Sequence, residues 1–234
     1  SETRRGGFYK AITVNKAVAS GKQSEEVLFY FTKSPHCSST LKPDAGSLSN
    51  YLFSDLFSVQ KEGKVPVVTL DSVLDNLSLP QIDWLKIDSQ GTDLRIFSGL
   101  SDKLHSHILA VDIEPGLIDA YIGEDLFVDA HKYLTRNGFW LSDLNVCGAV
   151  RMRRSAMNEI TKINKKINYG FVNKGVKKSP GWCEARYFRT INWLDEGNFS
   201  KREYVLLWAF ALLDKQFGFT VDLGIEYERV FGRD

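Results

Sequence analysis

The sequence predicts an α/β fold with parallel strands and with helices on the faces of the sheet. Between residues 65 and 144, short apolar runs alternate with stretches whose apolar residues recur at helical spacing. An alternation of strand and helix pairs strands in parallel, because each helix returns the chain to the start of the next strand. The proportions of 43% hydrophobic and 25% charged residues are those of a globular protein with an ordinary core.

Two strands are expected before this region. The residues from Ile12 to Ala19 and from Glu26 to Thr32 are rich in β-branched and aromatic side chains, which favour extended backbone. The segment from Ser34 to Asn50 is rich in Ser, Pro and Gly and has no helical period. The first part of the chain therefore predicts two strands followed by a surface loop.

The alternating region supplies the central strands. Val65 to Leu70 predicts a strand that leads into a short helix, and Ile82 to Asp88 predicts a buried strand. Thr92 is suited to cap a helix that ends near Gly99, because its hydroxyl can accept a hydrogen bond from a free backbone N–H. The remaining elements are a strand from Ile108 to Ile113, a helix that carries Leu126, Ala130, Tyr133 and Leu134, and a strand from Phe139 to Leu144.

The C-terminal part of the chain has a weaker pattern. Apolar residues from Met157 to Ile167 predict a rather polar amphipathic helix, and Ile191 to Leu194 predicts an edge strand. Lys201 to Phe217 predicts a strongly apolar helix. We therefore expect residues 1–145 to form a partial α/β core, and residues 146–234 to complete the sheet and add a helical extension.

Charge and hydropathy argue against several classes of partner. Thirty basic residues against 29 acidic ones leave a net charge of +1, which gives no overall attraction to nucleic acid or to a membrane surface. The longest apolar run, Tyr204 to Leu213, is far shorter than the ~20 residues that a membrane-spanning helix needs.

One stretch of the chain is locally basic. It has nine basic residues between Arg151 and Lys178, and Glu159 is the one acidic residue in the same stretch. We favour a solvated helix face for them over a site for an anionic substrate or nucleic acid.

The cysteine and histidine patterns favour a cytoplasmic protein without a metal site. Three scattered cysteines form no C-x-x-C pair, and the N-terminal residues lack the apolar core of a signal peptide. The four histidines have no companion at metal-ligand spacing, so solvated positions are expected for them.

One apolar stripe is expected to pack on the sheet, with a homodimer face as the alternative. It consists of Leu206, Leu207, Phe210 and Leu213.

Acidic residues follow three of the predicted strands. Asp71, Asp88 and Glu114 each stand at such an end, where ligands bind in open parallel sheets. Each acid could also cap the next helix, and this reading is favoured for Asp71. The site reading is favoured for Asp88, because residues 89–91 end in a glycine that allows close backbone approach. Both readings stay open for Glu114, and Lys86 is either an ion-pair partner of a neighbouring acid or a structural lysine.

The residues from Ile82 to Asp93 carry the most specific pattern. They resemble the signature of the FkbM methyltransferases, in which a hydrophobic strand ends in Lys-Ile-Asp and continues to a glycine followed closely by an acid. Neighbouring segments also resemble that family over about residues 11 to 145: Val68 to Asp71, Phe97 to Leu100, and Ala110 to Glu114.

The resemblance implies a Rossmann-like methyltransferase sheet and an O-methyltransferase that depends on S-adenosylmethionine. The acceptor would be a small molecule or glycan, commonly a sugar or polyketide hydroxyl. By position, Ala17 and Val18 would lie near the adenine, and Asp88 and Gln90 near the methionine end of the cofactor. Asp93 and Glu114 would lie on the acceptor side, and together with Asp88 they are the candidate catalytic residues.

The sequence departs from the family pattern in two places. Gln90 stands where the family usually has Glu, and no Gly-x-Gly motif follows a predicted strand, so the N-terminal portion of the family's sheet is expected to be missing. A non-catalytic module that binds a glycan or a protein is therefore a second hypothesis. A hydrolase that uses Asp88 and Glu114 as a carboxylate pair is a third.

Overall fold

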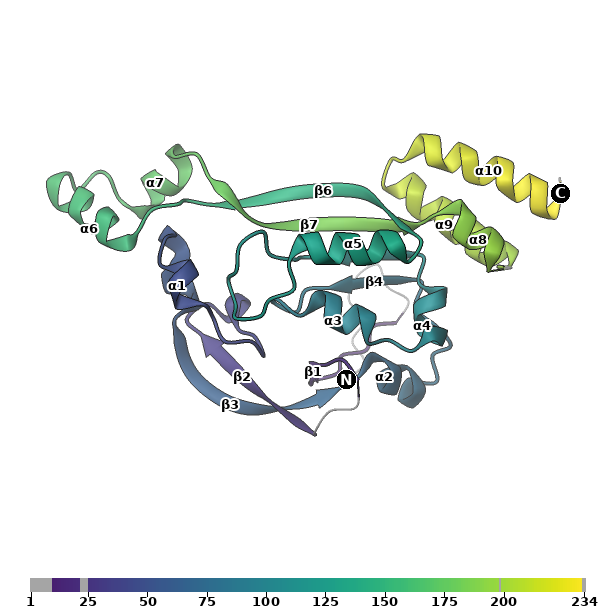
Figure 1. Ribbon diagram of the computed structural model, residues 1–234, viewed down its shortest axis with the longest axis horizontal. Coiled ribbons are helices and arrows are strands. Elements are labelled where there is room, and N and C mark those ends of the chain that lie inside the picture. The colour runs from purple at the N-terminus through teal and green to yellow at the C-terminus, as the bar shows by residue number, and fades with distance from the viewer. Residues whose placement is uncertain (1–9, 22–24, 198, 233–234) are drawn as a thin grey trace.

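The computed structural model describes residues 10–21, 25–197 and 199–232 (Figure 1). Its described part is a mixed α/β fold with two partly parallel sheets, as the sequence predicts. The first sheet has the strand order β1-β3-β2, and the second has the order β4-β5-β7-β6.

The three-stranded sheet is built around a long curved strand. β3 (Val59–Val68) pairs in parallel with β1 (Ala17–Val18) and antiparallel with β2 (Glu26–Thr32). The predicted bounds of β2 are confirmed, whereas the strand expected from residue 12 to residue 19 is reduced to two residues. β3 begins earlier than expected and ends where the Thr69 side chain caps α2 (Leu70–Leu77) by accepting a hydrogen bond from the N–H of Ser72 at 3.2 Å.

The segment expected to be a surface loop contains short helices. They are η1 (Pro35–Cys37) and α1 (Ala45–Leu48), and η2 (Leu52–Phe57) follows directly. The Asp44 carboxylate caps α1 by accepting hydrogen bonds from the N–H groups of Gly46 and Ser47. Leu48 is buried, so the segment packs against the rest of the protein and the loop prediction is wrong here.

The four-stranded sheet combines parallel and antiparallel pairs. β4 (Trp84–Ile87) and β5 (Ala110–Ile113) pair in parallel, as predicted. β7 (Ser179–Arg189) lies between β5 and β6 (Phe139–Ala149) and runs antiparallel to both. The expectation that the last strand of the alternating region continues the parallel pairing is therefore wrong, because a strand from later in the chain separates it from β5.

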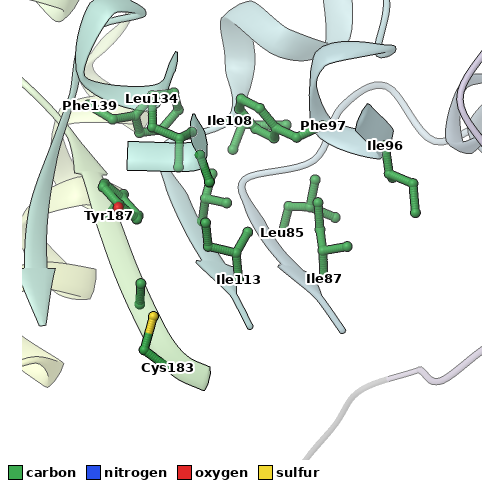
Figure 2. Close-up of a cluster of buried hydrophobic side chains, with 13 residues drawn as sticks. Leu85, Ile87, Ile96, Phe97, Ile108, Ile113, Leu134, Phe139, Cys183 and Tyr187 are labelled. Carbon is green, nitrogen blue, oxygen red and sulfur yellow. The ribbon is translucent and has the colours of Figure 1, made fainter. Parts of the chain in front are cut away.

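Helices cover both faces of this sheet. On one face, α3 (Asp93–Ser98) and α5 (Phe127–Arg136) pack against side chains of β4, β5 and β7. Figure 2 shows this cluster, in which Leu85 and Ile87 of β4 lie beside Ile113 of β5. On the other face, Trp84, Ala110 and Phe188 contact the C-terminal helices. Successive strand residues thus enter different cores, as in sheets that are buried on both sides.

The C-terminal region extends in two directions (Figure 1). β6 and β7 run lengthwise, with α6 (Arg154–Ile163) and α7 (Tyr169–Gly175) at one end. α8 (Ile191–Glu196), α9 (Lys201–Leu213) and α10 (Phe217–Phe231) lie at the other end. The edge strand expected at the position of α8 is wrong. The Thr190 hydroxyl accepts a hydrogen bond from the N–H of Trp193 at 3.3 Å, which starts a helix there.

Two further sequence predictions have mixed outcomes. Leu206, Leu207 and Phe210 pack into the core beside the sheet, as favoured, whereas Leu213 is 75% exposed. His105 and His107 lie in α4 (Asp102–His107) instead of a loop, and the His105 ring packs against Phe97 with centroids 4.9 Å apart. The prediction that His105 is solvated is therefore wrong.

None of the helices formed by the described residues is both long and apolar enough to cross a membrane.

Candidate active site

Parallel pairing brings Asp88 and Glu114 to the same edge of the sheet. Ile87 pairs with Ile113, so each acid directly follows the end of one of two neighbouring strands. The Nζ atom of Lys86 lies 2.6 Å from Oε1 of Glu114 and donates a hydrogen bond to it. This bond raises the pKa of Lys86. Asp71 does not join them, because β3 belongs to the other sheet.

The turn after β4 is tightly packed. Gln90 and Gly91 both have positive φ angles, +59° and +97°. A Cβ atom on Gly91 would lie 3.2 Å from Tyr121 and 3.3 Å from Glu124 and from Leu41, so a side chain fits poorly there. The close backbone approach expected from the sequence is present.

Hydrogen bonds fix the side chain of Gln90 at this turn. Its Nε2 donates to Oδ1 of Asp88 at 2.6 Å, and its Oε1 lies 3.1 Å from the donating hydroxyl of Tyr121. The hydroxyl of Ser39 donates to the backbone carbonyl of Gln90 at 2.7 Å. Gln90 therefore links Asp88 to Ser39 and to Tyr121.

Asp93 is buried at the start of α3 and is 1% exposed. One carboxylate oxygen accepts hydrogen bonds from the N–H and the hydroxyl of Ser89, and the other accepts one from the N–H of Glu114. Burial raises the pKa of Asp93, and these bonds oppose the rise. Asp93 thus joins the turn after β4 to the end of β5. The expected cap by Thr92 makes no side-chain hydrogen bond to the helix backbone.

A cavity of about 690 Å³ opens beyond the ends of β4 and β5. Asp88, Gln90 and Glu114 line it. Its wall includes the rings of Phe53, Phe57, Tyr121, Tyr169 and Trp182. It combines apolar rings with carboxylates, as ligand sites commonly do.

A second cavity, of about 290 Å³, lies on the side of the three-stranded sheet. Ala17, Val18, Asp88 and Gln90 line it. Ser38, Asp88 and Gln90 border both cavities, so the two spaces meet at this wall. Asp93 lines neither of the two. Of the six residues that the family resemblance implies, five therefore line the two cavities, and Asp93 does not.

A family model described as the methyltransferase FkbM domain matches residues 8–141. The chain belongs to the FkbM methyltransferase family. The match spans more than half of the 234 residues and includes all six predicted site residues. The two partly parallel sheets agree with a Rossmann-like methyltransferase fold. Neither a curated protein nor a solved structure matches the chain.

Membership of the FkbM family indicates methyltransferase activity, and a methyltransferase requires a methyl donor.

Within the ranges that the structure describes, no group of three or more His, Cys, Asp or Glu side chains is placed to hold a metal ion. The basic stretch of the chain contributes one residue to the larger cavity, Lys178, and α7 contributes Tyr169 and Asn173.

Glu124 is a functional candidate that the sequence analysis missed. It lines the larger cavity, and burial raises the pKa of its carboxyl group to about 7. It belongs to the loop between β5 and α5, where no motif marks it. Gly91 and Gly116 leave room for its side chain, but only the fold shows that these two glycines are its neighbours.

Proposed function

We propose that this FkbM methyltransferase transfers a methyl group from S-adenosylmethionine to a hydroxyl oxygen of a sugar, polyketide or related metabolite. One observation carries the proposal. The four residues that the family resemblance assigns to the cofactor line one cavity, and two of them also line the cavity that contains Glu114; the four are Ala17, Val18, Asp88 and Gln90.

The residues of the smaller cavity fit the two chemical halves of this cofactor. One part of the wall is apolar and suits an adenine ring; it consists of Ala17, Val18, Phe29, Leu70, Leu85, Ile87 and Ile96. The other lining residues carry hydroxyl, amide, carboxylate and ammonium groups that suit an amino acid; they are Ser38, Thr40, Lys86, Asp88, Ser89, Gln90 and Thr92. When bound, the cofactor supplies an electrophilic methyl group on sulfur.

The larger cavity fits an acceptor that carries hydroxyl groups. Aromatic rings such as Trp182 and Tyr169 can stack on the apolar face of a sugar, and carboxylates such as Glu114 can accept hydrogen bonds from its hydroxyls. Holding the acceptor oxygen beside the wall formed by Asp88 and Gln90 would align it with the methyl group. Such alignment supplies a large part of the rate enhancement.

The site residues have separate tasks in this proposal. The Gln90 amide holds Asp88 at the wall between the cavities, and Lys86 holds the carboxylate of Glu114. Asp93 contributes indirectly, because its buried carboxylate fixes the backbone of Ser89 and Glu114. It is a positioning residue in this account and does not contact the reacting atoms.

Methyl-labelled S-adenosylmethionine tests the proposal on the 234-residue chain. The chain is incubated with a panel of sugars, nucleotide-linked sugars and polyketides, and products are analysed for label on oxygen. We expect transfer to a hydroxyl, and we expect Asp88→Ala to abolish it. Saturable binding of a glycan without any transfer would instead support the non-catalytic binding module.

A further inference from the structure

Backbone hydrogen bonds hold one oxygen of the Glu124 carboxyl group. Oε2 accepts hydrogen bonds from the N–H groups of Ala120 at 2.7 Å and of Tyr121 at 3.0 Å. Oε1 accepts no hydrogen bond from any residue that the structure describes. A carboxylate fixed in this way has one oxygen available to accept a proton or a hydrogen bond.

Two glycines make space for this side chain. A Cβ atom on Gly116 would lie 2.8 Å from Cδ of Glu124, and one on Gly91 would lie 3.3 Å from its Cγ. Gly91 directly follows Gln90, which borders both cavities. Glu124 therefore lies beside the wall where the two cavities meet, on the side of the larger one.

The loop that carries Glu124 is fixed to α3. The carboxylate of Asp125 accepts hydrogen bonds from the backbone N–H of Arg95 at 2.8 Å and from its guanidinium at 2.7 Å. The N–H of Asp125 donates to the carbonyl of Gly91 at 2.9 Å. Because α3 starts at the turn after β4, Glu124 keeps a defined position relative to Asp88.

The surroundings of Glu124 favour its protonated form near neutral pH. Burial is the main cause of its raised pKa, and the negative charges of Asp119 and Asp93 add to it. The two N–H donors oppose the rise. Tyr121 is a titratable neighbour of Glu124, and burial raises the pKa of its phenol, so the phenol stays neutral. The Arg95 guanidinium donates to the carbonyl of Gly123 and is paired with Asp125, and Lys178 is a cation that lines the same cavity as Glu124.

We propose that Glu124 is the general base that removes the proton from the acceptor hydroxyl, which rests on the O-methyltransferase function proposed above. The proton moves from the acceptor oxygen to Oε1 of Glu124. The acceptor oxygen forms its bond to the methyl carbon, and the electron pair of the breaking carbon–sulfur bond stays on sulfur.

Glu124 fits this task better than the other two acids of the cavity. Glu114 is engaged by the Lys86 ammonium, and Asp88 is bound by the Gln90 amide. A general base works best when its pKa lies near the operating pH, because it is then both ionised in part and basic enough to accept the proton. Glu124 meets that condition, with a pKa of about 7.

The dependence of kcat/KM on pH tests the assignment. It is measured for the wild type, for Glu124→Gln, and for Asp129→Asn as a control at an exposed acid of α5. Gln keeps an oxygen that can accept from Ala120 and Tyr121, so the loop should stay folded. We expect kcat/KM of the wild type and of the control to rise with pH up to about 7 and then level off. Glu124→Gln should lower kcat by about 10²- to 10⁴-fold and lose this rise.

A second readout does not depend on turnover. The carboxyl carbon of Glu124, assigned by NMR through its absence in Glu124→Gln, should titrate near pH 7 rather than near 4.5. Full activity of Glu124→Gln in the presence of an active wild type would overturn the inference and leave the proposed function intact. Titration near 4.5 would overturn it as well. Absence of methyl transfer by the wild type would overturn the proposed function and the inference together.

Discussion

The carboxylate of Asp93 accepts a hydrogen bond of 2.8 Å from the backbone N–H of Glu114. The same side chain binds the N–H of Ser89 at 2.9 Å, so one buried acid fixes the chain just after β4 and just after β5. The relative position of Asp88 and Glu114 therefore depends on a residue that lies outside both cavities. An acid buried for this purpose affects catalysis and stability together.

Asp93→Asn should destabilise the protein. The amide has one accepting oxygen where the carboxylate has two, so at least one of the N–H groups of Ser89 and Glu114 loses its partner. A buried unsatisfied group costs about 1–3 kcal/mol, and urea denaturation should show a loss of that size. Asp75→Asn, at an exposed position of α2, is the matched control. Equal stability of the Asp93 and Asp75 variants would contradict the positioning role.

Gly116→Ala should reduce methyl transfer while the fold is retained. The new Cβ would lie 2.8 Å from Cδ of Glu124 and 2.8 Å from the backbone oxygen of Ile118, so both the carboxyl group and the loop backbone would have to shift. We expect kcat to fall at least about tenfold, because small displacements of a reacting group are costly. Gly175→Ala is the control, since nothing lies within 4 Å of a Cβ atom there. Unchanged kcat in Gly116→Ala would count against the catalytic position of Glu124.

The pKa of Glu124 also predicts a dependence of stability on pH. Its folded-state pKa of about 7 lies above the ordinary value of 4.5, so the folded protein binds the proton more tightly than the unfolded chain. The stability associated with this group is present below pH 4.5 and is lost as the pH rises to about 7. Glu124→Gln removes the effect. The variant should therefore gain stability relative to the wild type at pH 8 and gain little at pH 4.5, as urea denaturation at both values can measure. An equal difference at the two pH values would contradict the burial of this carboxyl.

Arg189 is fully buried, and none of the carboxylates that the structure describes pairs with it. Its guanidinium lies between the rings of Phe139 and Trp193, 3.7 and 4.0 Å from their centroids. It donates to the backbone carbonyls of Ile108, Asn137 and His105. Arg189→Met would leave these oxygens without a donor, so the free energy of unfolding should fall by about 3 kcal/mol. Arg136→Met, at an exposed position of α5, is the control and should change the free energy of unfolding little. A Tm equal to that of the wild type would refute the role of this residue.

The strands that carry the site could be predicted from the sequence. β4 and β5 are short apolar runs that each end in an acid, and both their pairing and the position of Asp88 beside Glu114 follow from the alternation of strand and helix. Asp71 also follows a predicted strand, although the sequence favours a helix-capping role for it. The strand before it, β3, pairs with β2 in the other sheet. The local sequence does not indicate which strands will pair over such a distance along the chain.

β7 was missed for a different reason. Its burial alternates, with Cys183, Ala185 and Tyr187 inside, but charged residues and a Pro-Gly pair interrupt the apolar pattern that marks the other strands. Ile191 to Leu194 contains the apolar residues of a strand, yet the Thr190 cap makes it helical. Glu124 could not be predicted either, because its raised pKa arises from burial, and its neighbour Gly91 is distant in sequence.

Calorimetric titration with S-adenosylhomocysteine can show whether the smaller cavity binds the cofactor. It is performed on the 234-residue chain, on Asp88→Ala, and on Ala17→Phe, which enlarges a side chain of β1 that lines the smaller cavity. The account predicts saturable binding at one site in the wild type and its loss in both variants. No binding to the wild type, or equal binding to all three chains, would contradict a cofactor site in the cavity that Ala17, Val18, Asp88 and Gln90 line.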